Sequence, residues 1–413
     1  MNAITEATAV CTDSQYADTI RSAPSVRVSG VNDAFSFWKL PEPWRPALEA
    51  TLAASRIITE WYLLERYRPR TSQLRQLALT IYYALKNVLP KDVRHLLNSA
   101  IVGLRRTRDF PRWPCEDALL VFWREWLRHS LETVGATDGW HIGFWPENKD
   151  SCIVLTHDVE SPAGFDRMEA LAELEMRYGF RSAWNLPLDQ YLIDWNRVEE
   201  LRARGFEFGA HGLRHDGMLF RSHKHFLALK PRLEALAHEH RLAGFRSPST
   251  HRTAEWMGSL DFDFDCSFAD TDPYEPQPGG TGSIFPFFLG SLVELPYTMP
   301  QDHTLINLLR CAPLPIWIRK MNWLAAQGGM ILTIVHPDYC GSGSGLRAYD
   351  ELLKRLSDLE SSWRALPSQV TAWWQSRDKL ELQLCGDRPI IHGPNSFNAV
   401  ARRLSSQRML HGD

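Results

Sequence analysis

Two carboxylates, Asp158 and Glu160, follow an apolar segment that begins at Cys152. The segment has the composition of a buried β-strand, and the polar residues fall where such a strand would end. Carboxylates are seldom buried without a partner. Two interpretations are therefore open. Either the pair lies at a strand end that simply reaches solvent, or its carboxylates transfer protons or bind a metal ion.

Two histidines, His211 and His215, follow another strand-like segment at 206–210. Side chains four residues apart on a helical turn point the same way and can share one metal ion. Such a pair can arise by chance in a chain with 15 histidines, but this one follows a strand of the same alternating unit. Two imidazoles and one carboxylate, for which Glu160 is the best candidate, leave a coordination position open for water.

Arg246 and His336 lie at the ends of two further strand-like segments, 244–248 and 330–335. An arginine there can hold a carboxylate by paired hydrogen bonds and favour its ionised form. A histidine opposite a metal ion can donate a proton to a leaving group. Taken singly, Arg246 is better explained by a surface salt bridge, and His336 by a capped strand end, than by a catalytic role. Because all the candidates fall at strand ends, we predict that they line one rim.

The elements that would position these residues alternate between strands and helices over roughly 190 residues, which predicts a parallel sheet or barrel with its site at the carboxyl ends of the strands. The tail is expected to be helical over 348–366 and 370–377. The first predicted strand begins at 152, and the later ones occupy 180–186, 206–210, 244–248, 292–297 and 330–335.

We predict four parts in the chain: a loosely ordered N-terminus (1–35), a helical extension packed on the barrel (36–137), the barrel with its C-terminal helices (138–380) and a tail (381–413). The stretch from 56 to 112 contains twelve Lys or Arg against four Asp or Glu. This basic layer is either a solvated face or a surface for an anionic lipid-linked or nucleotide-linked substrate, including peripheral membrane contact.

The composition narrows the classes of function. A net charge of -3 and a pI near 6.6 argue against nucleic acid as the main partner. We find no secretory signal and no apolar run of about 18 residues, so the expected compartment is the cytoplasm. The seven cysteines are scattered without metal-binding spacing and are expected to be reduced thiols.

In this order, the motifs resemble those of the polysaccharide deacetylases with a NodB-homology domain, carbohydrate esterase family four. The resemblance covers about 152–339, a little under half of the chain. It implies an α/β fold, a distorted (β/α) barrel, to which the N-terminal helical extension is added. The matching segments are 156–160, 211–215, 246–248, 265–268 and 332–336.

The resemblance also implies a role for each matching residue. Asp158 would be the general base, oriented by Arg246, and His336 the general acid. One divalent ion, usually zinc, would be bound by Glu160, His211 and His215. The backbone N–H of Ser249 would stabilise the oxyanion, and Pro248 and Asp265 would lie near the substrate.

Two positions depart from the family pattern. Glu160 stands where the family normally has aspartate, which lengthens the arm that reaches the metal. Ser249 stands where an aromatic residue usually follows the proline, so the floor of the substrate site should differ. The Pro- and Gly-rich segment 272–282 is predicted to be either a spacer or a lid over the rim.

The resemblance implies a hydrolase that removes an N-acetyl group from an amino sugar in a polysaccharide or glycan precursor, by metal-activated water. Its partner would be an N-acetylated carbohydrate. One alternative is a deformylase or another amide hydrolase with a different substrate. A second alternative is a catalytically dead carbohydrate-binding homologue, if Glu160 weakens metal affinity.

Overall fold

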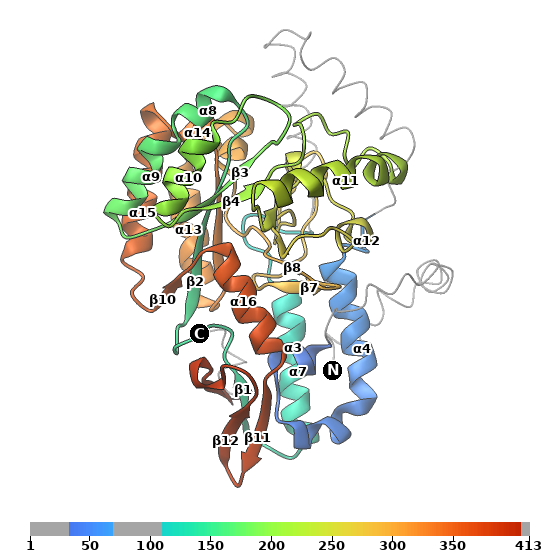
Figure 1. The fold of residues 1–413 in the computed structure, drawn as a ribbon. Helices are drawn as coiled ribbons and strands as arrows, with labels where there is room; N and C mark the ends of the chain where they lie inside the picture. Colours follow the sequence, from blue (N-terminus) through green and yellow to red (C-terminus); the bar gives the residue numbers. More distant parts are fainter. Residues whose placement is uncertain (1–32, 69–109, 406–413) are drawn as a thin grey trace.

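The computed structural model describes residues 33–68 and 110–405, which form a large sheet-centred body and a smaller helical part beneath it (Figure 1). The central sheet has nine strands in the order β10-β2-β3-β4-β5-β6-β8-β7, and β9 pairs with β2. All its pairings are parallel except β7 with β8. The strands are β2 (Ser151–Asp158), β3 (Ser182–Leu186), β4 (Glu207–Ala210), β5 (Gly244–Phe245), β6 (Phe264–Asp265), β7 (Phe287–Leu289), β8 (Leu292–Glu294), β9 (Met330–Val335) and β10 (Ser362–Arg364).

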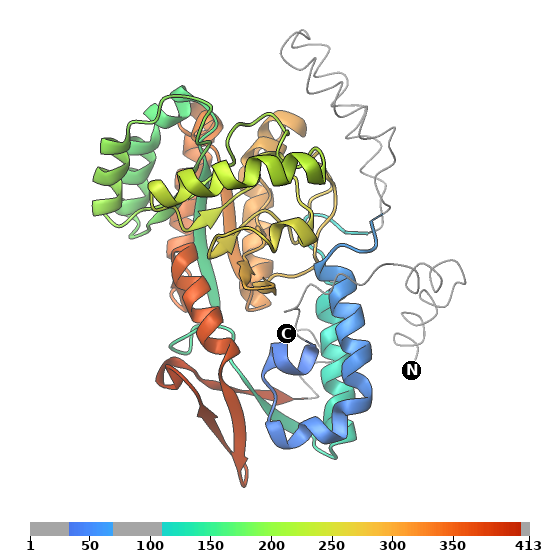
Figure 2. The same cartoon turned by 45° about the vertical axis from the view of Figure 1, so that its right-hand side comes forward.

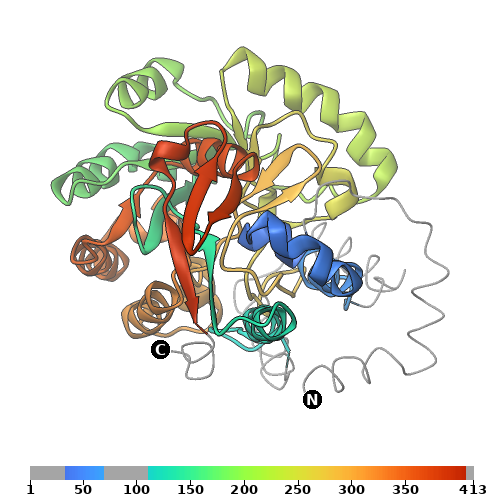
Figure 3. The same cartoon turned by 90° about the horizontal axis from the view of Figure 1, so that it is seen from below.

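The sheet curls until its two ends meet. The backbone N–H groups of Thr298 and Met299, just beyond β8, donate to the carbonyl oxygen of Leu332 in β9, at 3.2 and 3.0 Å. Seen from below, the helices form a ring around the sheet (Figure 3). Strand β2 is buried at every position, as expected for a central parallel strand covered on both faces. The predicted fold class, a distorted (β/α) barrel with an N-terminal helical extension, is confirmed.

Helices connect the parallel strands, because a crossover between parallel strands needs a long connection. One prediction is wrong in part: the helix expected over 348–366 ends at Ser357, and Ser362–Arg364 instead pairs with β2. Backbone pairing with a central strand overrides the local helical pattern there. The helices are α8 (Pro162–Asp166), α9 (Met168–Arg177), α10 (Trp195–Ala203), α11 (His223–Glu239), η2 (Pro248–Thr250), α12 (Ala254–Met257), η3 (His303–Leu308), α13 (Pro313–Ala326), α14 (Pro337–Cys340), α15 (Gly343–Ser357) and α16 (Pro367–Asp378).

The smaller part combines both ends of the described chain. Its two long helices, α4 and α7, lie side by side (Figure 2). The segment predicted as a tail contributes a hairpin, β11 with β12, and a strand, β13, that pairs with β1. The elements are α3 (Ala34–Trp38), η1 (Glu42–Trp44), α4 (Arg45–Leu63), α7 (Ala118–Thr133), β1 (Asp138–Ile142), β11 (Glu381–Cys385), β12 (Arg388–His392), η4 (Ser396–Asn398) and β13 (Ala401–Ser405).

The predicted flexible N-terminus and most of the basic stretch lie outside the described residues. Within 33–68 and 110–405, no helix is both long and apolar enough to cross a membrane. None of the six cysteines in the same residues forms a disulfide.

A buried polar network beneath the rim connects β2, β3, α9 and α15. The carboxylate of Glu175 accepts hydrogen bonds from Ser182 Oγ at 2.6 Å and Tyr349 Oη at 2.5 Å. His157 Nε2 lies 2.6 Å from the same carboxylate, and its Nδ1 lies 2.9 Å from the carbonyl oxygen of Val335. His157, inside the first motif, therefore supports the fold rather than facing the rim.

Replacing Glu175 with alanine should lower the free energy of unfolding by about 3–5 kcal/mol, because three buried polar groups lose their shared partner. Urea denaturation followed by circular dichroism measures this change. Glu173→Ala, an exposed position on the same helix, is the matched control and should have little effect. A loss below about 1 kcal/mol for Glu175→Ala would contradict this account of the network.

Candidate metal centre

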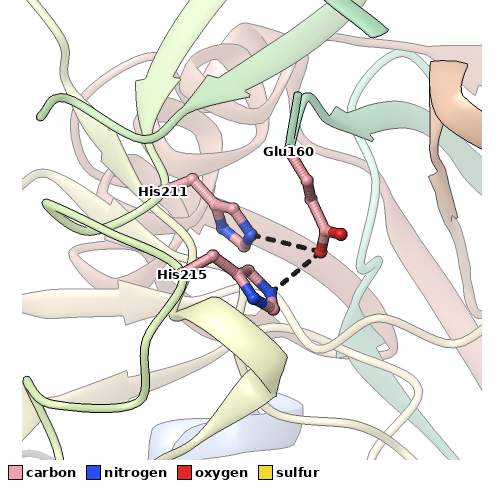
Figure 4. A group of neighbouring side chains, drawn as sticks. All are labelled: Glu160, His211 and His215. Carbon is pink, nitrogen blue, oxygen red and sulfur yellow. Dashed lines mark ion pairs between the residues drawn. The ribbon is translucent and has the colours of Figure 1, made fainter. Parts of the chain in front are cut away.

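Three side chains from two strand ends converge at the rim of the barrel. Glu160 follows β2, while His211 and His215 follow β4. The Glu160 carboxylate points toward both imidazoles (Figure 4), with its Oε1 2.9 Å from His215 Nε2 and 3.9 Å from His211 Nε2. One ligand atom from each residue lies within 4.8 Å of the other two. The structure thus brings together the three residues predicted as metal ligands.

The chemistry of this group fits a metal ion. His211 Nδ1 donates to the carbonyl oxygen of Arg246 at 3.0 Å, which leaves the lone pair on Nε2. That Nε2 atom is buried and has no hydrogen-bond partner among the described residues. Donors about 2.1 Å from one tetrahedral ion lie about 3.4 Å apart, between the two separations measured from Glu160. The glutamate that departs from the family pattern is therefore long enough for a shared ion.

Gln190, which the sequence analysis did not single out, connects the two segments that carry the ligands. Its side-chain amide donates to the backbone oxygen of Glu160 at 2.5 Å, and its carbonyl oxygen accepts from the backbone N–H of His215 at 2.6 Å. Gln190 lies in the loop after β3, between β2 and β4. Only knowledge of this strand order could have identified it.

Asp158, the last residue of β2, is buried and ion-paired. Its Oδ2 lies 3.5 Å from Arg246 Nη1, and its Oδ1 accepts a 2.9 Å hydrogen bond from Asn185. Burial opposes ionisation, but the charges of Arg246 and His336 and the hydrogen bond from Asn185 lower the pKa of Asp158. Asp158 is therefore ionised at neutral pH and can accept a proton. The sequence analysis missed Asn185, although this residue lies in a predicted strand.

Arg246 is fully buried just beyond β5 and donates to Thr156 Oγ1 at 3.1 Å. Besides Asp158, it lies near a pair of acidic residues. That pair is Asp265 and Glu294, where burial raises the pKa of both carboxyls. Asp265 is fully buried and accepts from Ser267 Oγ at 2.6 Å. This position does not favour the predicted substrate contact. Asp265 is instead one of the groups that raise the pKa of Arg246.

His336, which follows β9, is held by Asp302, a residue that was not among the predicted site residues. Asp302 accepts from the His336 backbone N–H at 2.8 Å and lies 2.6 Å from its Nδ1. The other ring nitrogen, Nε2, lies 3.7 Å from Glu160 Oε1. Burial disfavours the charged imidazole, but Asp302 and Glu160 outweigh it and raise the pKa of His336 to about 10. His336 can therefore donate a proton toward the ligand group.

This pKa predicts how Asp302→Asn should affect the metal-free protein. A histidine whose pKa is about 10 in the folded state and about 6.5 unfolded adds stability that is complete below about pH 6.5 and is lost as the pH rises through 10. The variant should therefore be less stable by a few kcal/mol at pH 6, and the difference should shrink toward pH 10. Urea denaturation with a chelator present measures it.

Asp261→Asn is the matched control, because Asp261 pairs with His238 at 3.0 Å on the exposed surface. Its stability should follow that of the wild-type protein at each pH. A stability difference for Asp302→Asn that grows from pH 6 to pH 10 would contradict the assignment of Asp302 as the partner of charged His336.

The remaining predicted residues lie in short loops around the ligand group. Ser249 and Pro248 form part of η2, and Ser249 Oγ lies 3.5 Å from His215 Nε2. His303 packs near His336, with ring centroids 6.3 Å apart. The segment 272–282, predicted to be either a spacer or a lid, is mostly buried. Two of its glycines approach the helical extension closely, Gly279 at Glu65 and Gly282 at Leu119.

No protein-family model matches the chain, and no curated protein matches its sequence. Solved structures with a similar fold include a Mycobacterium smegmatis protein assigned as a polysaccharide deacetylase, with 17% identity and a TM-score of 0.46 over 60% of this chain and 96% of the other. A Pseudomonas aeruginosa PAO1 protein with the same assignment has 14% identity and a TM-score of 0.45, over 56% and 93%. PuuE allantoinase has 16% identity and a TM-score of 0.40, over 56% and 92%.

Proposed function

We propose that this protein is a metal-dependent hydrolase that removes the N-acetyl group from an amino sugar in a polysaccharide or glycan precursor. One observation carries the proposal. Asp158, paired with Arg246 at 3.5 Å, and His336, whose Nδ1 lies 2.6 Å from Asp302 and whose Nε2 lies 3.7 Å from Glu160 Oε1, are both buried at the end of the barrel that carries the three-residue ligand group. Amide hydrolysis needs both a base that accepts a proton from water and an acid that protonates the departing amine.

Glu160, His211 and His215 would hold the ion. Two imidazole nitrogens and one carboxylate oxygen suit zinc, as in other catalytic sites that keep one position open. When bound, such an ion supplies Lewis-acid chemistry, lowering the pKa of water and polarising a carbonyl oxygen. Gln190 keeps the two segments that carry these ligands in register.

The chain's own residues divide the proton transfers. Asp158 accepts the proton of the attacking water, and Arg246 and Asn185 keep its carboxylate ionised and oriented. His336 donates a proton from Nε2 to the leaving nitrogen, while Asp302 holds Nδ1 and fixes the orientation of the ring. The Ser249 backbone N–H is the proposed donor to the developing oxyanion, an interaction worth about 3–4 kcal/mol in comparable sites.

Metal analysis followed by product assays tests the proposal. The protein is stripped with chelator, reloaded with zinc and assayed for acetate release from N-acetylated chito-oligosaccharides. Zinc-dependent release of acetate is the expected result. Parallel assays use formylated compounds and small non-sugar amides, and hydrolysis of one of these without acetate release from the oligosaccharides would show a hydrolase with another substrate. Failure to take up zinc at all would overturn the proposal and favour the catalytically inactive homologue.

A further inference from the structure

A buried ion pair joins the helical extension to the rim of the barrel. Glu65, just beyond α4, accepts from Arg252 through both carboxylate oxygens, at 2.5 and 2.8 Å. The two side chains are only 4% and 1% exposed. Arg68 donates a further hydrogen bond to Glu65 at 2.7 Å. A buried, bidentate pair of this kind is geometrically specific, and either partner alone is costly to leave buried.

Arg252 carries this connection to the loop beside the ligand group. Its Nη1 donates to the carbonyl oxygen of Thr250 at 3.0 Å, and its backbone N–H donates to Gln277 Oε1 at 2.8 Å. Ser249 and Thr250 have φ values of 52° and 48°, a left-handed conformation that is strained for a β-branched residue. Such strain persists only where the surroundings hold it. Ser249 lies against His215, so the position of this loop sets one wall of the site.

The same end of the extension holds the second rim loop, 272–280. Tyr67 Oη accepts from the Gly280 N–H at 2.8 Å and donates to the Gly280 carbonyl oxygen at 2.7 Å. A side chain at Gly279 would place its Cβ 2.3 Å from Glu65 Oε1, so only glycine admits this approach. The loop also carries Glu275, which is close enough to the ligand group for the charge of Glu160 to act on it.

We propose that the helical extension is part of the catalytic unit, with Glu65 as a positioning residue. Through Arg252 it holds the loop 248–252 against the ligand group, and with Tyr67 it holds the loop 272–280 beside it. The inference rests on the proposed hydrolase function for its catalytic consequence. The extension thus contributes to the site through residues that lie outside the barrel motifs.

Glu65→Gln in the full-length protein tests the inference, because glutamine keeps the size of the side chain but weakens the pair. We expect kcat/KM on the N-acetylated substrate to fall by about 10–100-fold, the scale of a small misplacement in an active site. Zinc stoichiometry should stay unchanged. In the zinc-free protein, amide hydrogen exchange in 248–252 and 272–280 should become faster, and Glu65→Asp should restore part of both properties.

Glu60→Gln is the matched control, since Glu60 pairs with Arg56 and Arg66 at 3.0 Å near the same end of the extension. It should leave activity and exchange unchanged. An equal loss in both variants, or wild-type activity and exchange in folded Glu65→Gln, would overturn the inference.

If Glu65→Gln does not fold, Tyr67→Phe replaces it, because this change removes the two Gly280 hydrogen bonds and keeps the ion pair. Slower turnover with faster exchange in 272–280 then supports the inference, and wild-type behaviour overturns it. If the wild-type protein hydrolyses none of the substrates, the proposed function fails. The hydrogen-exchange comparison still shows whether Glu65 positions the two loops.

Discussion

Asp158→Asn is expected to lower kcat by about 10²–10⁴-fold while the protein keeps its zinc. Asparagine preserves the shape of the side chain and can still accept from Asn185, but it cannot take a proton from water. The ligand atoms of Glu160, His211 and His215 are unchanged, so metal affinity should stay close to that of the wild-type protein. Steady-state kinetics and metal analysis of the same preparation measure both properties.

The control for this variant is Glu207→Gln. Glu207 is a carboxylate of the same sheet that bonds to Ser368 Oγ at 2.5 Å, at the opposite end of β4 from the ligand group. It should retain wild-type turnover. Full activity of Asp158→Asn would exclude Asp158 as the base. Loss of zinc together with loss of activity would show that this carboxylate is instead a metal ligand.

His211→Ala should remove both the metal and the activity. His211 is buried, and the lone pair of its Nε2 points into the ligand group without another partner among the described residues. Losing a residue that only supports a ligand typically lowers metal affinity 10–100-fold, so loss of the ligand itself should exceed about 100-fold. Titration with zinc in the presence of a competing chelator measures the affinity, and acetate release measures the activity.

His141→Ala is the matched control for His211→Ala. His141 is also buried and its Nδ1 also bonds to a backbone carbonyl, that of Ile142 at 3.1 Å, but it lies in β1 away from the rim. It should bind zinc with wild-type affinity. Stoichiometric zinc in His211→Ala would exclude the Glu160, His211 and His215 group as the metal site.

Together, the two variants separate proton transfer from metal binding. Asp158→Asn changes turnover at constant metal content, whereas His211→Ala changes metal content first. Glu65→Gln should resemble Asp158→Asn in keeping the metal, but it should also loosen two loops that Asp158 does not contact. These three patterns are distinct, so each assignment can fail independently of the others.

The sequence by itself predicted the barrel and the residues at its strand ends. Apolar runs in a strand–helix alternation require a covered parallel sheet, and the carboxyl ends of parallel strands meet at one rim. Asp158, Glu160, His211, His215, Arg246 and His336 could be proposed because each lies at the end of such a run or within five residues after it. The predicted strand 330–335 agrees with β9 for the same local reason.

Only the tertiary structure decided which residues support this group. Asp302, Asn185 and Gln190 reach the site from loops or strands whose neighbours are set by strand order, and no local pattern distinguishes them from other polar residues. Glu65 and Arg252 are 187 residues apart in the chain, so their pairing depends on where the extension packs. The candidate catalytic and metal-binding residues could be predicted from the sequence because they lie near the ends of strands. The residues that hold them in place could not be predicted, because they act through contacts between segments that are distant in the chain.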